Sequence, residues 1–156
     1  MKDIKQYLKK LKIKFKTHSH PQLYTCEQAE KYNKNIKGIH SKNLFIKSKK
    51  SSMFYLIIIP ANEKLEIKKF ELILNEKLCF ANEKELKNIL NITAGAVSPF
   101  ALINDKNNKT TLIIKKDIWN SDFVSFHPNI NIETLELKGN DFQKYINSLK
   151  NKSILF

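Results

Sequence analysis

The sequence contains no arginine, although it has 28 basic side chains against 15 carboxylates and a formal net charge of +13. All 28 are therefore lysine. A basic excess is typical of proteins that bind polyanions such as nucleic acids. Heavy use of Lys, Asn and Ile is equally typical of an AT-rich genome, so codon bias accounts for part of the charge. Without guanidinium groups, any phosphate contact uses lysine ammonium groups and not bidentate forks.

Cysteine is also scarce, with Cys26 and Cys79 alone and no CxxC pair. This excludes a disulfide framework, and we expect no metal site and no cofactor. No apolar run reaches the roughly 18–20 residues of a membrane span. The N-terminus lacks the apolar region and cleavage site of a secretory signal. These absences predict a cytoplasmic protein that does not associate with membranes.

The length of 156 residues and the even composition predict one domain over residues 1–156. Hydrophobic spacing and capping residues predict five helices and six strands. The predicted helices are 3–11, 25–32, 67–74, 82–90 and 141–149. The predicted strands are 44–47, 53–59, 100–103, 110–115, 123–126 and 132–137. We expect an α+β fold with a mixed, mainly antiparallel central sheet covered by helices.

Two features of this pattern place strands relative to one another. Segment 53–59 is apolar on both faces, which predicts a central position in a covered sheet. Segments 100–103 and 110–115 flank a turn-rich stretch at 104–108, which predicts a hairpin.

No motif of a known catalytic apparatus is present: there is no HExxH, no GxSxG, and no Walker or Rossmann glycine pattern. Of the four histidines, His18 and His20 could form a metal pair, but no cluster completes it, and a loop pair before Pro21 is preferred. His40 is expected in a loop. His127 ends a strand before Pro128, and spacing alone favours neither a packed nor a functional role. An enzyme of this composition would have to position a water molecule against an activated ester.

Two short segments could bind a ligand. The run Gly95-Ala96-Val97-Ser98-Pro99 could be a rigid loop whose amides form an oxyanion hole, although the residues alone favour a tight helix-to-strand connection. The pair Lys42-Asn43 precedes a strand, where a solvated strand edge is the simpler interpretation.

Four segments carry a resemblance over nearly the whole chain, in the same order and at similar spacing. They are His20-Pro21 with 24–29, Gly38 to Lys47, Gly95 to Phe100 with 103–105, and Phe126-His127-Pro128. In these segments the sequence resembles the superfamily of YbaK and the editing domains of prolyl-tRNA synthetase, most closely its free-standing prolyl-tRNA editing members. Two positions depart from the family pattern. Ser41 stands where threonine is usual, and Cys26 stands where an aliphatic residue is common, which could shift side-chain selectivity.

The resemblance implies hydrolysis of the ester on mischarged tRNA(Pro), typically alanyl-tRNA(Pro), by a monomeric enzyme without a cofactor. Its partner would be the tRNA acceptor end, with prolyl-tRNA synthetase as a further partner left open. Lys42 and Gly95 would be the catalytic residues, and Lys42 and Asn43 would hold the tRNA end. The expected substrate-binding residues are Asn43, Ala96, Val97, Ser98, Pro99, Phe126 and His127. The alternatives are a cysteinyl- or seryl-tRNA deacylase of the YbaK type and a non-catalytic tRNA-binding module.

Overall fold

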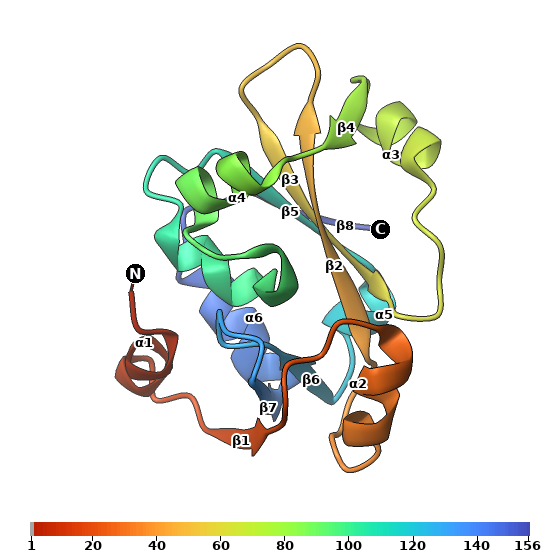
Figure 1. The fold of residues 1–156 in the computed structure, drawn as a ribbon. Coiled ribbons are helices and arrows are strands. Elements are labelled where there is room, and N and C mark those ends of the chain that lie inside the picture. The colour runs from red at the N-terminus through yellow and green to blue at the C-terminus, as the bar shows by residue number, and fades with distance from the viewer. Residues whose placement is uncertain (1) are drawn as a thin grey trace.

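The strands of the protein form two sheets. A computed structural model describes residues 2–156, except for the side chain of Cys26. One sheet is antiparallel with the order β1-β7-β6, and the other has the order β4-β2-β3-β5-β8 (Figure 1). The strands are β1 (Phe15–Ser19), β2 (Ser41–Ser48), β3 (Phe54–Pro60), β4 (Leu78–Phe80), β5 (Thr110–Ile114), β6 (Phe123–Phe126), β7 (Glu133–Lys138) and β8 (Ser153–Leu155).

The helices cover these sheets. They are α1 (Ile4–Lys10), α2 (Cys26–Asn33), α3 (Ile67–Leu74), α4 (Glu83–Leu90), α5 (Lys116–Trp119) and α6 (Gly139–Asn147), with the 3-10 helices η1 (Ala94–Ala96) and η2 (Pro99–Asn104). The predicted α+β class with mainly antiparallel pairing is confirmed, since only β3–β5 and β5–β8 pair in parallel. The expected single central sheet is divided into two. Within the described residues, every helix is too short or too polar to cross a membrane.

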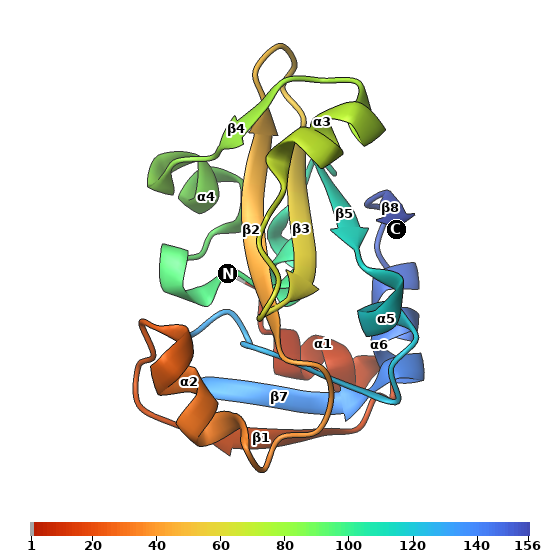
Figure 2. The same ribbon diagram turned by 90° about the vertical axis from the view of Figure 1, so that its right-hand side faces the viewer.

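The two sheets run crosswise, and the larger core fills the space between them (Figure 2). β3 is buried along its whole length and lies in the middle of its sheet, as its unbroken apolar run predicted. On the far face of that sheet, a second core gathers around Phe70 of α3 and Ile57 of β3. Burial on both faces explains why β3 shows no polar alternation.

The predicted hairpin at 104–108 is wrong. Residues 100–103 belong to η2, and β5 pairs with β3 in parallel. The local reason is a helix start, because the Ser98 hydroxyl accepts a hydrogen bond from Phe100 N and Pro99 occupies the first helical turn. The Asp105 carboxylate then accepts from the amides of Lys109 and Thr110, which turns the chain into β5.

The buried hydroxyl of Tyr145 on α6 positions the segment between η1 and η2. It donates to the Pro99 carbonyl oxygen at 3.0 Å, and no part of the Tyr145 side chain is exposed. This bond ties α6 to an irregular segment that has no ladder of its own.

We predict that Tyr145→Phe destabilises the protein by about 1–3 kcal/mol, because the buried Pro99 carbonyl loses its donor. Urea unfolding at pH 7 measures the change. The matched control is Tyr7→Phe, whose hydroxyl contacts Ser148 Oγ at the surface and should cost less than about 0.5 kcal/mol. Equal losses in the two variants would contradict the assigned role of Tyr145.

Candidate functional site

A cleft of about 290 Å³ opens where α2, the start of β2, η1 and the β6–β7 connection meet. The residues that line it are Leu23, Tyr24, Thr25, Ala29, Asn33, His40, Ser41, Asn43, Gly95, Ser125, Phe126, His127 and Thr134. Four of the residues predicted from sequence are in this set: Asn43, Gly95, Phe126 and His127. The cleft therefore unites segments that lie more than 80 positions apart in the chain.

Asn43 is anchored to the opposite wall of the cleft. Its side-chain Nδ2 donates to the Val97 carbonyl oxygen at 3.0 Å, which joins β2 to the end of η1. The Asn43 Oδ1 atom and the Ser41 Oγ atom are buried and have no hydrogen-bond partner among the described residues. Since side chains alternate along a strand, Ser41 and Asn43 share the face that lines the cleft.

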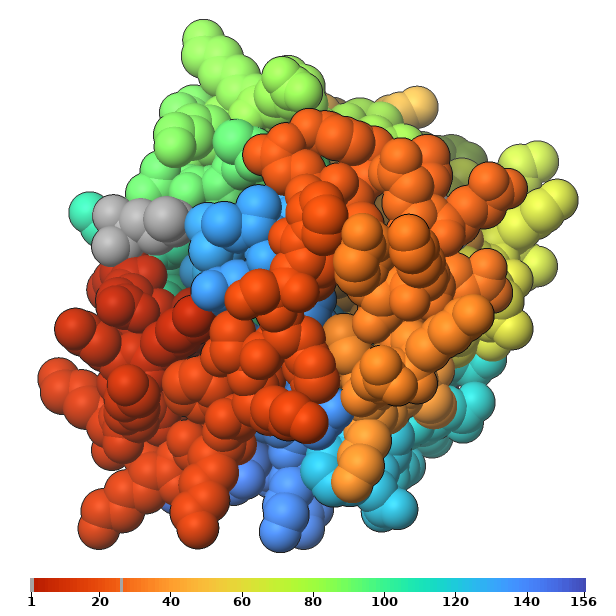
Figure 3. Space-filling model, turned by 60° about the horizontal axis from the view of Figure 1, so that its bottom comes forward, coloured from red at the N-terminus to blue at the C-terminus, as the bar shows by residue number. Residues whose placement is uncertain are grey.

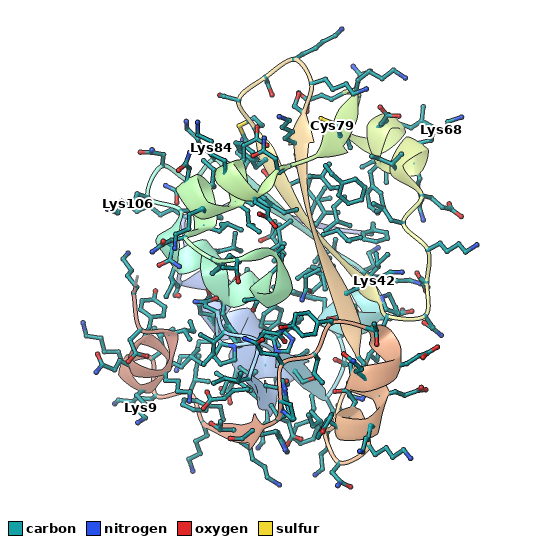
Figure 4. The ribbon with its side chains drawn as sticks, in the orientation of Figure 1. Lys9, Lys42, Lys68, Cys79, Lys84 and Lys106 are labelled. Atoms are coloured by element: carbon teal, nitrogen blue, oxygen red, sulfur yellow. The ribbon has the colours of Figure 1, made fainter. Side chains whose placement is uncertain are left out.

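Lys42 lies between these two residues and is not among the lining residues. By the same alternation its side chain leaves β2 on the opposite face, where it is half-buried. Figure 4 shows Lys42 beside β2 and β3. The structure thus places Lys42 next to the cleft, and its predicted catalytic role stays a prediction.

Gly95 lines the cleft, and there is no room for a side chain at this position. A neighbouring side-chain amide occupies that space. A Cβ atom at position 95 would lie 2.9 Å from Nδ2 of Asn131, closer than real Cβ contacts. The same Nδ2 donates to the Leu23 carbonyl oxygen at 2.8 Å. Asn131 therefore ties the segment before α2 to η1, and glycine at position 95 makes this possible.

The other residues of the run 95–99 do not line the cleft but pack behind its wall. Ala96, Ser98 and Pro99 are buried and do not line it, and Val97 contributes the carbonyl that holds Asn43. The Ala96 amide donates to Thr93 O at 3.0 Å, so this amide is already engaged. Of the loop predicted to touch the substrate, Gly95 alone faces the cleft.

His127 presents one ring nitrogen as an acceptor. Its Nδ1 atom lies 2.8 Å from the Glu133 carbonyl oxygen, which can only accept, so Nδ1 carries the proton and Nε2 is an acceptor in the neutral ring. Burial lowers the pKa of His127, and the charge of His20, whose ring centroid lies 5.6 Å away, adds to this effect. Burial likewise lowers the pKa of His40. In both rings burial disfavours the charged form.

The other histidines are structural. His20 is buried and its Nε2 contacts Thr134 Oγ1 at 2.9 Å, beneath the cleft. His18 lies on β1 and faces Glu136 at 3.3 Å, so the expectation that both occupy a loop was wrong for His18. Among the described residues no group of three or more His, Cys, Asp or Glu side chains is placed to hold a metal ion.

The lining has hydroxyls, amides and neutral imidazoles, and its named residues include no carboxylate and no lysine. Such a site can orient a polar ligand and a water molecule. It offers no paired carboxylates for acid–base catalysis and no activated nucleophile.

Sequence reasoning missed the wall formed by the segment before α2, α2 itself and β6. The missed lining residues are Leu23, Tyr24, Thr25, Ala29, Asn33, His40, Ser41, Ser125 and Thr134. The available signal was the N-cap residue Thr25, whose side chain accepts from Gln28 N at the start of α2. A helix start marks a fold element but does not indicate which surface it faces. The selectivity expected from Cys26 concerns a side chain outside the described part of the chain.

A family model described as the aminoacyl-tRNA editing domain matches residues 20–145. The chain belongs to this family. The match begins at His20 below the cleft and ends at Tyr145, so it includes every lining residue.

Relatives of this editing domain are similar over most of its length. The prolyl-tRNA editing protein ProX of Acetoanaerobium sticklandii is 33% identical over 140 residues, which cover 89% of this chain and 85% of the relative. The prolyl-tRNA synthetase associated domain-containing protein 1 of Bos taurus is 26% identical over 156 residues, covering 97% and 91%.

Solved structures support the fold. A candidate trans-editing enzyme for prolyl-tRNA synthetase superimposes with a TM-score of 0.69 at 14% identity, covering 89% of this chain and 83% of that chain. A protein without an assigned function gives a TM-score of 0.76 at 14% identity, covering 98% and 97%. At this identity the likeness concerns the fold alone.

We predict that Gly95→Ala destabilises the editing domain by about 1–2 kcal/mol, because the new methyl group displaces the Asn131 amide from Leu23 O. Asn131→Ala should remove the clash, so the double variant should be less destabilised than the sum of the single variants. A double-mutant cycle by urea unfolding measures the coupling. Strictly additive losses would refute the contact as the reason for glycine.

We also predict a pH dependence of stability. Because burial lowers the pKa of His127 and His40 below 6.5, the unfolded chain binds more protons than the folded chain as pH falls through 6.5. Their contribution to stability is complete above that pH and is lost below it. His127→Asn, which keeps a donor for Glu133 O, should reduce the stability difference between pH 7.5 and pH 5.5. An unchanged difference in this variant would contradict the prediction.

Proposed function

We propose that the protein is a trans-editing deacylase that hydrolyses the ester of mischarged tRNA(Pro), with alanyl-tRNA(Pro) as the preferred substrate. The observation that carries the proposal is the cleft itself: it is small, it is built from backbone and neutral polar groups, and it lies within the family match. The name of the ProX relative supports the choice of tRNA(Pro).

The reaction suits a site without a strong base. A water molecule attacks the carbonyl carbon of the aminoacyl ester, the bond to the ribose oxygen breaks, and the amino acid and the free tRNA hydroxyl leave. An ester of this kind is activated, so positioning and polarisation supply most of what is needed. In this proposal the Nε2 atom of His127 accepts a hydrogen bond from the water or from a ribose hydroxyl.

The size of the cleft supports the proposed preference for alanine. A synthetase that binds proline cannot strongly exclude a smaller amino acid, since a missing methylene is worth only about 1–3 kcal/mol. A second site that rejects proline by size corrects the error. A cleft of about 290 Å³ that must also admit the ribose leaves room for a small side chain.

Lys42 has a different role in this proposal from the residues that line the cleft. Its half-buried side chain leaves β2 away from them, which favours a contact with the tRNA backbone near the 3′ end over a contact with the amino acid. Asn43, fixed to Val97 O, keeps the wall of the cleft in place and offers its amide to the terminal nucleotide.

The purified protein should be incubated with alanyl-, cysteinyl-, seryl- and prolyl-tRNA(Pro), and loss of the ester followed by acid precipitation. We expect alanyl-tRNA(Pro) to be hydrolysed fastest and prolyl-tRNA(Pro) to be spared. If the cysteinyl or seryl ester is lost faster than the alanyl ester, that amino acid replaces alanine as the proposed substrate. If all four esters decay as in buffer, the protein is a binding module and the proposal is wrong.

Lys42→Ala should lower the deacylation rate by at least tenfold while the unfolding midpoint stays within error, because a half-buried lysine without an ion pair contributes little to stability. The matched control is Lys16→Ala, an exposed lysine on β1 that should keep the wild-type rate. Wild-type turnover of Lys42→Ala would remove Lys42 from the mechanism.

A further inference from the structure

A second hollow, of about 740 Å³, lies outside the cleft. We call it the lysine groove, and it lies between the N-terminal end of the chain, the end of α4 and the turn after η2. Its lining residues are Lys2, Lys87, Asn88, Ile89, Asn91, Asn104, Asp105, Lys106 and Asn107. Figure 4 shows Lys106 at the margin of the molecule, on the same side as Lys84 of α4.

The groove has an excess of positive charge. It has three lysines and one carboxylate, and Asp105 is turned inward, where it accepts from two backbone amides and from Asn151 Nδ2. Among the described residues, the ion pairs of lysine involve Lys5, Lys47 and Lys115, none of which lines the groove. The ammonium groups of Lys2, Lys87 and Lys106 therefore form no ion pair within 4.0 Å among the described residues.

A comparable hollow beside α3 shows that a lysine-rich sequence does not produce this arrangement everywhere. That hollow is lined by Lys50, Lys68 and Lys77, but Glu71 and Glu76 line it as well. The lysine groove has the same number of lysines and half as many carboxylates.

The polar groups of the groove match a phosphodiester chain. Ammonium groups contact phosphate oxygens, and the amides of Asn88, Asn91 and Asn107 can contact ribose hydroxyls. Asn104 maintains the floor, since its Nδ2 donates to Leu90 O and its Oδ1 accepts from Lys2 N. The lining contains no aromatic residue, so recognition there does not depend on base stacking.

A smaller hollow shares a lining residue with the groove and adjoins the cleft in sequence. It is lined by Lys2, which also lines the groove, and by Pro128, Asn129 and Ile130, which follow His127 of the cleft. In Figure 3, the light-blue atoms of the segment after β6 lie between the orange segment before α2 and the green atoms of the α4–η1 region.

We propose that the lysine groove binds the phosphate backbone of the tRNA whose 3′ end occupies the cleft. The identity of this nucleic acid rests on the proposed function. In the groove, lysines contact the phosphates and asparagines contact the riboses of the tRNA, and the cleft selects the amino acid.

The test is the double variant Lys87→Gln/Lys106→Gln. Binding of uncharged tRNA(Pro) should weaken roughly tenfold or more at 0.1 M salt, and the slope of log Kd against log salt should fall by about 1–2, because each lost phosphate contact removes about 0.7–0.9. With alanyl-tRNA(Pro) the KM should rise and kcat should stay unchanged. The variant should hydrolyse the alanylated trinucleotide CCA, which is too short to reach the groove, at the same rate as the wild type.

The matched control is Lys50→Gln/Lys68→Gln, which removes the same charge from the hollow beside α3. Wild-type affinity and salt slope in the groove variant would overturn the inference, and so would an equal loss in the control, because net charge alone would then explain both. These binding measurements do not need catalysis. If the wild type hydrolyses no ester, the proposed function fails, while the comparison of the two variants still decides whether the groove binds tRNA.

Discussion

The site depends on holding a buried, irregular segment between two sheets. Residues 96–104 form no strand, so their carbonyl groups cannot be satisfied by a ladder, and an unpaired buried carbonyl costs about 1–3 kcal/mol. Side chains of two other elements supply donors: Asn43 of β2 donates to Val97 O, and Tyr145 of α6 donates to Pro99 O. At the end of the segment, Asn104 in turn donates to Leu90 O of α4. One wall of the cleft is therefore fixed by polar side chains, while the cores around it are apolar.

This arrangement explains which parts of the fold could be predicted from sequence. Elements with a strong local signal were found with accurate ends, as for Ile67–Leu74 and Phe123–Phe126, because period and capping are local properties. β4 and β8 were missed because each has three residues and exists only through pairing with a distant strand. The failed hairpin has the same origin, since β5 obtains its partners from β3 and β8 and not from its neighbours in sequence.

The site was predictable to a similar degree. Asn43, Gly95, Phe126 and His127 were named from motif resemblance, and the structure brings them into one cleft. The alternation of β2 could have separated Asn43 from Lys42 in advance, had the strand been started at Ser41 instead of Leu44. The resemblance pointed to residues 24–29 at the start of α2, but the lining residues there could not be named, because amphipathic spacing shows that a helix packs and does not show which hollow it borders.

Gly95 has a consequence for variation among sequences of this fold. Its backbone is not in the left-handed region, where Gly38 has φ of 101°, so the absence of a side chain serves its neighbour and not its own torsion angles. The residue allowed at 95 depends on the length of the side chain at 131, and the reverse also holds. Substitutions at the two positions are therefore coupled. A smaller residue at 131 has to come first, and only then can position 95 acquire a side chain that changes the shape of the cleft.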